Sequence, residues 1–541
     1  MRIIIIGGVA AGMSCATRLR RLNEKDEIIV LEKGDYVSFA NCGLPYHLSN
    51  EIANRQDLIL QSPKSLKERF NIDVRVNNEV IKINRKDKIV TINNGIILNY
   101  DKLVIATGQK AFIPKLQNID KSNNVFTLRT INDMDDILSY INNHKVKKAV
   151  VIGGGFIGIE AAENLAKVKI NTTIIEANNQ LLSNLDIEMA KYAENKLNDN
   201  NIKVYLNRKV GSFLDNGKAI KLDNNEILEC DLVILSTGIR ANSELAENAN
   251  LELGLNKGIK VNENYQTSDK DIYACGDVIV VNNQVSNTAS LISLASLANR
   301  QGRQVADNIN GINRKNKGGI ATSILRAFDL TCASSGLNET ALKSLNIDYK
   351  AVHIIANNHA GYFPNANSIV LKLIFDKNTG KIYGAQAVGK DGVDKRIDVL
   401  ATAIKANLTV FDLPELELCY SPPFGSAKDP VNMIGYAALN IVEGISDNIQ
   451  YYELDEYRKN GAILLDVRSD EEIKNGSMNH DIHIPLNQLR NRLNELPLDK
   501  LIIASCHSGQ RSYLAERILK NNNFNVKNLD GAYAIYKMGV K

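Results

Sequence analysis

The sequence predicts an α/β protein with two parallel β-α-β units in its first half and a smaller α/β segment at its C-terminal end. Short apolar runs at residues 3–6 and 149–152 each lead through a glycine-rich turn into a helix-like segment, as expected for a buried parallel strand followed by a crossover helix. A third strand, loop and helix follow one another at residues 501–520. The 541 residues, 44% of them hydrophobic, suffice for about three or four domains.

The composition narrows the classes of function. The formal net charge is only +4 and the basic residues are scattered, so there is no reason to expect a nucleic-acid partner. No apolar run approaches the roughly 18 residues that cross a membrane. The first residues resemble a secretory signal in outline, but a second copy of the same pattern near residue 150 argues against that interpretation.

The cysteines point to a reducing compartment. They are odd in number and widely spaced, and they form no C-x-x-C pair, which argues against a disulfide framework and against a metal site of the zinc type. We therefore expect a cytoplasmic protein with free or catalytic thiols among its seven cysteines, at positions 15, 42, 230, 275, 332, 419 and 506.

The first glycine-rich turn predicts a dinucleotide site. After the strand at residues 3–6, Gly7 and Gly12 stand where such a site needs a tight turn and a close helix–strand contact, although Val9 replaces the middle glycine. The helix is expected to begin with "MSCATRLRRLN" and to direct its N-terminus at a pyrophosphate. The next strand ends at Glu32, 20 residues after Gly12, where a carboxylate can bind a ribose hydroxyl.

The second turn carries the complete pattern. Gly153, Gly155 and Gly158 have G-x-G-x-x-G spacing between a strand and a helix, and the following strand ends at Glu176. A carboxylate there would repel a 2′-phosphate, so the sequence favours NADH over NADPH. Two Rossmann-like dinucleotide-binding domains in one chain are typical of a flavoenzyme that holds FAD and is reduced by a nicotinamide.

Three further stretches extend this pattern: "DKLVIATG" at 101–108, "DLVILSTG" at 231–238 and "DIYACGDV" at 271–278. In this order, and with the two turns, they resemble the pyridine nucleotide-disulfide oxidoreductase family over residues 1–440. The resemblance implies an FAD domain at 1–112 and 242–318, interrupted by an NAD(P)H domain at 113–241. It also implies that the residues around the cofactors include Glu32, Lys33, Val80, Thr107, Gly108, Arg129, Gly238 and Asp277.

A single cysteine in "SFANCGLPYH", Cys42, lies where this family places its redox-active sulfur. His47 stands where dithiol members have their second cysteine, so Cys42 has no internal partner, and its oxidised form would be a mixed disulfide, a persulfide or a sulfenic acid. The single-cysteine branch includes NADH oxidases and peroxidases, and coenzyme A-disulfide reductases. Ala10 replaces the histidine that is typical of the peroxide-handling members, and "SFANCGLPY" is similar to the reductase motif.

Basic and polar residues suggest a coenzyme A site. Arg18 and Arg21 are three apart, and so lie on one helix face that could bind phosphates. The resemblance adds Ser14, Ser38, Asn41 and Asn299 as substrate contacts. It also implies an α+β dimerisation domain at 319–443, in which the second copy of a homodimer completes the site and a tyrosine hydroxyl protonates the leaving thiolate. The residues contributed in this way would be Tyr362, Tyr420 and Lys428.

The remaining segment, residues 447–541, resembles a rhodanese domain. In "CHSGQRS" the backbone N–H groups after Cys506 can surround an anion, Gly509 permits the sharp turn, and the next helix directs its positive end inward. The six residues from Cys506 to the catalytic candidate Arg511 match the sulfurtransferase loop, whereas related phosphatases use a longer one. "GSMNHDIHIP" departs from the glycine-histidine-isoleucine turn that rhodaneses usually show.

Together these resemblances imply an FAD-dependent NAD(P)H oxidoreductase that reduces coenzyme A disulfide, coenzyme A persulfide or polysulfide through Cys42, with sulfur carried by Cys506. The expected partners are a small-molecule thiol, disulfide or persulfide and a second copy of the chain. Two alternatives remain at this point. One is an NADH oxidase or peroxidase that uses a cysteine sulfenate, and the other is a non-enzymatic redox or sulfur-relay sensor.

Overall fold

The computed structural model describes residues 1–540 and divides into two compact units, each of which is considered by itself. The first unit contains residues 1–179 and 201–321, and the second contains residues 180–200 together with those from 322 onward. The mixed α/β fold class predicted from the sequence is confirmed. Within the described residues no helix combines the length and the apolar character that a membrane span requires.

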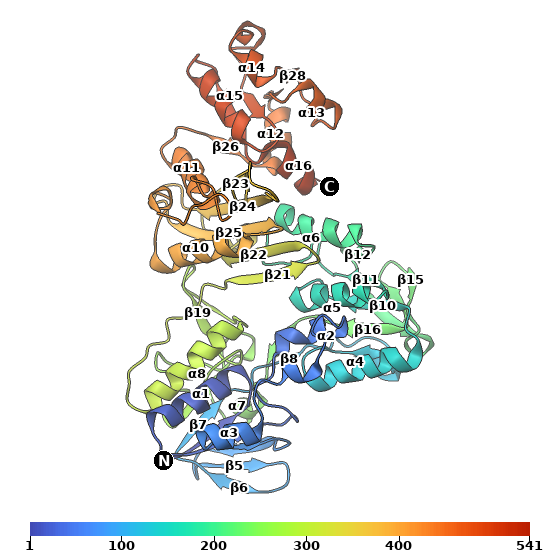
Figure 1. Ribbon diagram of the computed structural model, residues 1–541, viewed down its shortest axis with the longest axis vertical. Helices are drawn as coiled ribbons and strands as arrows, with labels where there is room; N and C mark the ends of the chain where they lie inside the picture. The colour runs from blue at the N-terminus through green and yellow to red at the C-terminus, as the bar shows by residue number, and fades with distance from the viewer. Residues whose placement is uncertain (541) are drawn as a thin grey trace. The chain divides into compact units, whose positions relative to one another are not determined.

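A five-stranded parallel sheet forms the core of the N-terminal part of the first unit, in the order β18-β7-β1-β2-β3. Helices α1 and α8 lie side by side against the sheet (Figure 1), and the same hydrophobic core also includes Val80, Ile83, Val90 and Ile92 of a small antiparallel sheet. Helix α1 begins at Ala10, three residues before the predicted helix, because the small residues of the turn already form its first turn. The bounds are β1 Arg2–Ile6, β2 Glu27–Leu31, β3 Asp73–Arg75, β7 Lys102–Ile105, β18 Ile272–Ala274, α1 Ala10–Leu22 and α8 Ala295–Ile309.

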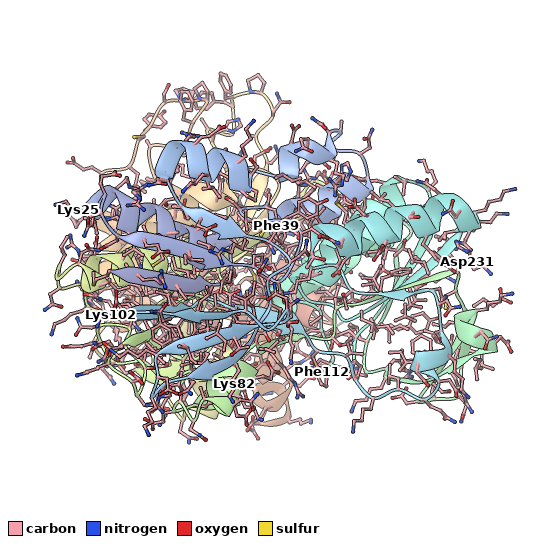
Figure 2. The ribbon with its side chains drawn as sticks, turned by 90° about the horizontal axis from the view of Figure 1, so that it is seen from below. Lys25, Phe39, Lys82, Lys102, Phe112 and Asp231 are labelled. Carbon is pink, nitrogen blue, oxygen red and sulfur yellow. The ribbon has the colours of Figure 1, made fainter. Side chains whose placement is uncertain are left out.

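A second five-stranded parallel sheet has the order β12-β11-β10-β16-β9. An antiparallel pair, β8 with β17, lies where the chain passes between the two sheets. There the backbone carbonyl of Phe112 accepts a hydrogen bond from Thr237, and its ring lies 4.0 Å from the Arg240 guanidinium. Figure 2 shows Phe112 between Lys102 of the first sheet and Asp231, which directly precedes β16 of the second. The bounds are β8 Gln109–Ala111, β9 Val125–Phe126, β10 Lys148–Ile152, β11 Asn171–Ile175, β12 Lys203–Tyr205, β16 Leu232–Leu235, β17 Ile239–Ala241, α4 Ile131–His144 and α5 Phe156–Lys167.

Small antiparallel sheets and short helices complete the first unit. Each small sheet is a run of consecutive strands, so its pairing is local in sequence. The bounds are β4 Val80–Asn84, β5 Ile89–Ile92, β6 Ile97–Asn99, β13 Val210–Leu214, β14 Ala219–Leu222, β15 Ile227–Glu229, β19 Val281–Asn283, β20 Thr288–Ser290, α2 Leu44–Leu48, α3 Pro63–Phe70 and α7 Glu244–Asn248.

The second unit is built on two sheets. An antiparallel sheet has the order β21-β22-β25-β24-β23, and a parallel sheet has the order β26-β30-β29-β27-β28. Helix α6 packs beside α16 (Figure 1). The first sheet and its helices are β21 Ser323–Ala327, β22 Leu330–Gly336, β23 Lys350–Asn357, β24 Ser368–Phe375, β25 Ile382–Gly389, α6 Ile187–Asp199, α9 Glu339–Ser344, α10 Val393–Ala406 and α11 Pro430–Val442. The second sheet and its helices are β26 Asn448–Ile449, β27 Ile463–Asp466, β28 Ile482–His483, β29 Ile502–Ser505, β30 Val526–Leu529, α12 Leu454–Lys459, α13 Asp470–Lys474, α14 Leu486–Leu489, α15 Gln510–Lys520 and α16 Ala532–Val540.

A buried ammonium group lies at the centre of the second unit. Lys372 Nζ contacts Asp186 at 2.7 Å and both Glu188 and Glu339 at 2.5 Å. Burial alone would lower the pKa of Lys372, but the three carboxylates raise it well above its ordinary value. Removing one partner of such a buried cluster would leave charges uncompensated, at a cost of about 3–5 kcal/mol. The cluster therefore fixes segments that are distant in sequence.

Helices α1 and α8 approach so closely that only glycine fits at one contact. A Cβ at Gly302 would lie 2.1 Å from the Ala11 carbonyl oxygen. We expect Gly302→Ala to lower the free energy of unfolding by about 1–3 kcal/mol because the helices must separate. Urea unfolding would measure this loss. Gly211→Ala is the matched control, since its Cβ would meet only Lys221 O at 3.5 Å; equal stability of the two variants would contradict the prediction.

The charge of His353 makes the stability of the second unit depend on pH. Burial alone would lower the pKa of His353, but Asp530 and Glu188 raise it from 6.5 to about 9. This stabilisation is fully present below the unfolded pKa and is lost as the pH rises through about 9. We expect His353→Gln to lower the melting temperature strongly at about pH 6 and much less at about pH 10. An equal difference at both pH values would show that His353 is not charged in the folded protein.

Candidate functional site

The two glycine-rich turns of the first unit have the same local geometry. Gly7 and Gly153 have φ values of +103° and +112°, which favour glycine. A Cβ at Gly12 would lie 1.9 Å from Gly7 O, and one at Gly158 would lie 2.0 Å from Gly153 O. Each helix can therefore start directly against its strand, with its N-terminal N–H groups available to a phosphate.

An acid at the end of the next strand reaches back to each turn. Glu32 Oε2 accepts a hydrogen bond from Gly8 N at 2.8 Å, and Glu176 Oε2 accepts one from Gly154 N at 2.7 Å. Apart from its own chain neighbours, no atom of residues 1–540 lies within 4 Å of a Cβ built at Gly155, so there is open space in front of helix α5. A glycine cradle, a helix N-terminus and a carboxylate fit a dinucleotide in both places.

Asp277 lies near several residues that were predicted to surround the first dinucleotide. Arg129 is half-buried; partial burial lowers its pKa, while the charge of Asp277 opposes that change. Burial likewise raises the pKa of Asp277, and Arg129 opposes it. A Cβ at Gly108 would lie 3.8 Å from Arg129 Nη2, and Thr107 donates to Asn242 O at 2.7 Å. Of the other predicted cofactor residues, Val80 is buried in β4, Lys33 is exposed and Gly238 has φ +110°.

Cys42 lies in a short 3₁₀ turn, Asn41–Gly43, directly before α2. Its side chain is exposed and free, whereas the other cysteines of the first unit are buried, at positions 15, 230 and 275. Desolvation raises the pKa of the Cys42 thiol, and the charges of Glu160 and Asp277 raise it further. The predicted contact residue Asn41 donates to Arg129 O at 3.3 Å, so Cys42 and the Asp277 group lie together.

Helix α2 and helix α5 contribute residues beside Cys42 that sequence analysis missed. Tyr46 donates to Glu160 Oε1 at 3.1 Å, and Ser49 donates to Asn164 at 2.6 Å. His47, at the position of the second cysteine in dithiol enzymes, lies with its Nδ1 2.6 Å from Ile52 O and so supports the local turn. No local pattern links residues 46 and 160, which are 114 positions apart.

The predicted substrate residues of helix α1 meet helix α8. Ser14 Oγ donates to Asn299 Oδ1 at 2.5 Å, and Arg18 Nε contacts Asp307 Oδ1 at 2.7 Å. Burial lowers the pKa of Arg21, and the nearby positive charges of Arg303 and Arg18 lower it further. Arg303 was not predicted, although its position four residues after Asn299 places the two on one helix face. Ser38 adjoins the first turn and donates its backbone N–H to Gly8 O at 2.8 Å.

Two of the predicted residues in the second unit come together. The hydroxyls of Tyr362 and Tyr420 lie 3.3 Å apart, although the residues are 58 positions apart in sequence. They are 78% and 50% exposed, and their mutual hydrogen bond raises the pKa of Tyr362. Lys428, the third predicted residue of this group, is also exposed.

Cys506 is buried at the end of β29, and the following loop wraps around its sulfur. Gly509, at φ +95°, donates its N–H to Sγ at 3.2 Å, and Ser512 Oγ lies 3.4 Å from Sγ. Arg511 instead makes two contacts with Glu472, at 2.6 and 2.7 Å, and this ion pair lowers the pKa of Glu472 to about 2. Sequence analysis missed Ser512 and Glu472.

The segment that departs from the rhodanese pattern is nevertheless well anchored. Asp481 accepts a hydrogen bond from Leu464 N at 2.8 Å, and His483 Nε2 lies 2.9 Å from Arg468 O. Arg468 itself forms a buried ion pair with Asp466 at 2.7 Å. In place of the glycine-histidine-isoleucine turn, this segment is held by hydrogen bonds to β27 and to the residues that directly follow it.

Family comparisons agree with this architecture. Residues 1–302 match the pyridine nucleotide-disulphide oxidoreductase family, residues 323–430 match its dimerisation domain, and residues 451–538 match the rhodanese-like domain. The coenzyme A disulfide reductase of Staphylococcus haemolyticus is 37% identical over 448 residues, which cover 81% of this chain and 100% of that protein.

Two solved structures are similar over almost the whole chain. The structure of reduced Bacillus anthracis CoADR-RHD is 48% identical, with a TM-score of 0.98 over 99% of this chain and 98% of that one. A NAD-dependent persulfide reductase from A. fulgidus is 38% identical, with a TM-score of 0.93 over 99% of this chain and 100% of that one. The chain belongs to the pyridine nucleotide-disulphide oxidoreductase family and carries a C-terminal rhodanese-like domain.

Proposed function

We propose that this protein is an FAD-dependent NAD(P)H oxidoreductase that reduces coenzyme A disulfide and coenzyme A persulfide through Cys42, and that Cys506 carries sulfane sulfur. The similar proteins named coenzyme A disulfide reductase and persulfide reductase support both substrates. The domain boundaries predicted from the sequence, a homodimer, and a cytoplasmic location belong to the same proposal. The matched dimerisation domain supports the homodimer.

The observation that carries the proposal is the isolation of Cys42. It is the exposed cysteine of the first unit, while Cys15, Cys230 and Cys275 are buried, so no second thiol of that unit is available to it and the sulfur that pairs with Cys42 in the proposed cycle is that of a substrate. The Cys42 thiolate attacks one sulfur of the substrate, the S–S bond breaks, and one thiolate leaves. FAD and NADH, when bound, would supply the two electrons that, with two protons, return the mixed disulfide to two thiols.

The chain's residues suit coenzyme A. Arg18, Arg21 and Arg303 place positive charge on helices α1 and α8, where the phosphates of the nucleotide end can bind. Ser14 and Asn299 add hydrogen-bonding groups beside them. The exposed Tyr362 hydroxyl lies 3.3 Å from that of Tyr420 and carries a proton that it can give to the leaving thiolate. In the proposed homodimer the second copy supplies this tyrosine, with Tyr420 and Lys428.

Glu176 supports NADH as the reductant. Its carboxylate is at the turn of the second cradle, where it would bind ribose hydroxyls and repel a 2′-phosphate. Cys506 suits sulfur transport because Gly509 N–H donates to its sulfur and the start of helix α15 adds positive potential. We propose that Cys506 passes sulfur to coenzyme A and that Cys42 reduces the resulting persulfide to sulfide and thiol.

Anaerobic NADH consumption tests both thiols. With coenzyme A disulfide, Cys42→Ser is expected to lose at least about 1,000-fold in turnover because the nucleophile is gone, whereas Cys506→Ser retains the activity of the unchanged protein. In a second assay, polysulfide is the sulfur source and coenzyme A is present only in a small, recycled amount. Both variants are expected to lose sulfide release in this assay, because the proposed cycle needs both thiols.

The controls separate the alternatives. NADH-dependent sulfide release by Cys42→Ser would disprove the cycle. Rapid oxygen uptake without any thiol substrate would instead identify an NADH oxidase, and flavin reduction without turnover would identify a sensor. If Cys506→Ser releases sulfide from polysulfide as fast as the unchanged protein does, the rhodanese-like domain takes no part in the cycle.

A second prediction concerns the thiolate of Cys42. Because the Glu160 charge raises the pKa of this thiol, Glu160→Gln is expected to lower that pKa. At a fixed pH below the pKa, more thiolate is then present and iodoacetamide reacts faster with Cys42. The pH profile of the alkylation rate, followed by mass spectrometry, would measure the shift.

Tyr46→Phe is the matched control for this experiment. It removes the hydrogen bond to Glu160 but leaves the Glu160 charge in place. Its alkylation profile should therefore not move to lower pH. A shift of equal size and direction in both variants would show that the effect comes from packing of helix α2 and not from the carboxylate charge.

A further inference from the structure

A strained turn follows the last strand of the rhodanese-like domain. Strand β30 ends at Leu529, and Asp530 leads into Gly531 and Ala532, which have φ values of +60° and +48°. Alanine rarely adopts such a value, so the surrounding contacts must hold it there. A side chain at Gly531 would approach Ile535 to 2.2 Å and the Cβ of His353 to 3.3 Å, so the turn also lies tightly against its neighbours.

The residues after this turn hold the loop of Cys506. Tyr533 donates its backbone N–H to Cys506 O at 3.1 Å, and Ala534 donates to His507 O at 2.9 Å. These bonds orient the two peptide groups at the start of the loop, in which Gly509 N–H donates to the sulfur. The position of the turn therefore determines where the Cys506 loop lies.

The turn is fixed from outside the rhodanese-like domain. Asp530 accepts hydrogen bonds from the backbone N–H of His353, at 3.1 and 3.2 Å, and from its Nδ1 at 2.6 Å. His353 belongs to β23, in the sheet that precedes the residues matched to the rhodanese-like domain. Its Nε2 lies 3.2 Å from Glu188 Oε1, and Glu188 in turn contacts Lys372.

We propose that His353 is a positioning residue for sulfur transfer at Cys506, acting through Asp530 and the turn that hydrogen-bonds the Cys506 loop. The inference rests on the proposed role of Cys506 as a sulfur carrier and assigns part of that site to the antiparallel sheet. The fully buried side chains of His353 and Asp530 have no room to exchange partners, so a lost Nδ1 donor leaves the carboxylate under-satisfied. The turn then relaxes from its strained conformation and the loop follows it.

Thiosulfate and cyanide provide a direct assay of Cys506 in the full-length protein. The Cys506 thiolate attacks the outer sulfur of thiosulfate, the S–S bond breaks, sulfite leaves, and Cys506 becomes a persulfide. Cyanide then takes the outer sulfur as thiocyanate and restores the thiolate. No electrons are needed from NADH, so this assay is independent of Cys42.

Two polar substitutions at His353 distinguish positioning from general packing. In His353→Asn the side-chain amide nitrogen is bonded to Cγ, as Nδ1 of histidine is. It can therefore still donate a hydrogen bond to Asp530. In His353→Gln the amide nitrogen corresponds to Nε2 and can donate only towards Glu188. We expect His353→Asn to keep most of the thiocyanate formation and His353→Gln to lose about ten-fold or more in kcat.

NADH-dependent reduction of coenzyme A disulfide serves as the measure of intact folding, and both variants should retain it. Tyr452→Phe is a further control because it removes a 2.8 Å bond to Glu339, a member of the Lys372 cluster, without touching Asp530, and it should leave thiocyanate formation unchanged. Equal thiocyanate formation by His353→Gln and the unchanged protein would overturn the inference, as would equal losses in the Asn and Gln variants. If the unchanged protein forms no thiocyanate, the proposed role of Cys506 fails, and this inference fails with it.

Discussion

The second unit depends on the charge of one buried lysine. The ammonium group of Lys372 binds Asp186 just before α6, Glu188 within α6 and Glu339 of α9. Through Glu188 it supports His353 and hence Asp530. Gln386 also donates to Asp186, and Tyr349 and Tyr452 also donate to Glu339, but these neutral donors do not replace the buried positive charge. A single cation thus links the antiparallel sheet, helix α6 and the rhodanese-like sheet into one body.

The first unit depends on a different constraint, the close approach of backbone to backbone. At Gly12 and Gly158 a side chain would collide with the carbonyl of the preceding turn. This contact places each helix N-terminus next to the end of its strand. The N–H groups of the first helical turn are then available to bind a phosphate in front of the helix. Because the same arrangement occurs twice, two dinucleotides can be bound by two similar cradles with different neighbours.

The two cysteines with proposed chemical roles have opposite surroundings. Cys42 is exposed, has a raised pKa and lies near the carboxylates of Glu160 and Asp277. Cys506 is buried and receives an N–H donor from its own loop. An exposed thiol can accept a bulky disulfide, whereas an enclosed sulfur that accepts an N–H hydrogen bond can hold a small sulfane adduct. This division matches a reductase joined to a sulfur carrier.

The sequence alone determined the features that depend on neighbouring residues. Strands, glycine turns and the acids at Glu32 and Glu176 follow from short-range spacing, and the loop after Cys506 follows from its length and composition. The contacts of Arg303, Glu160 and Glu472 with the predicted site residues required the tertiary structure. The same is true of the pair formed by His353 and Asp530, 177 residues apart, because a single sequence contains no signal for which distant charges are buried together.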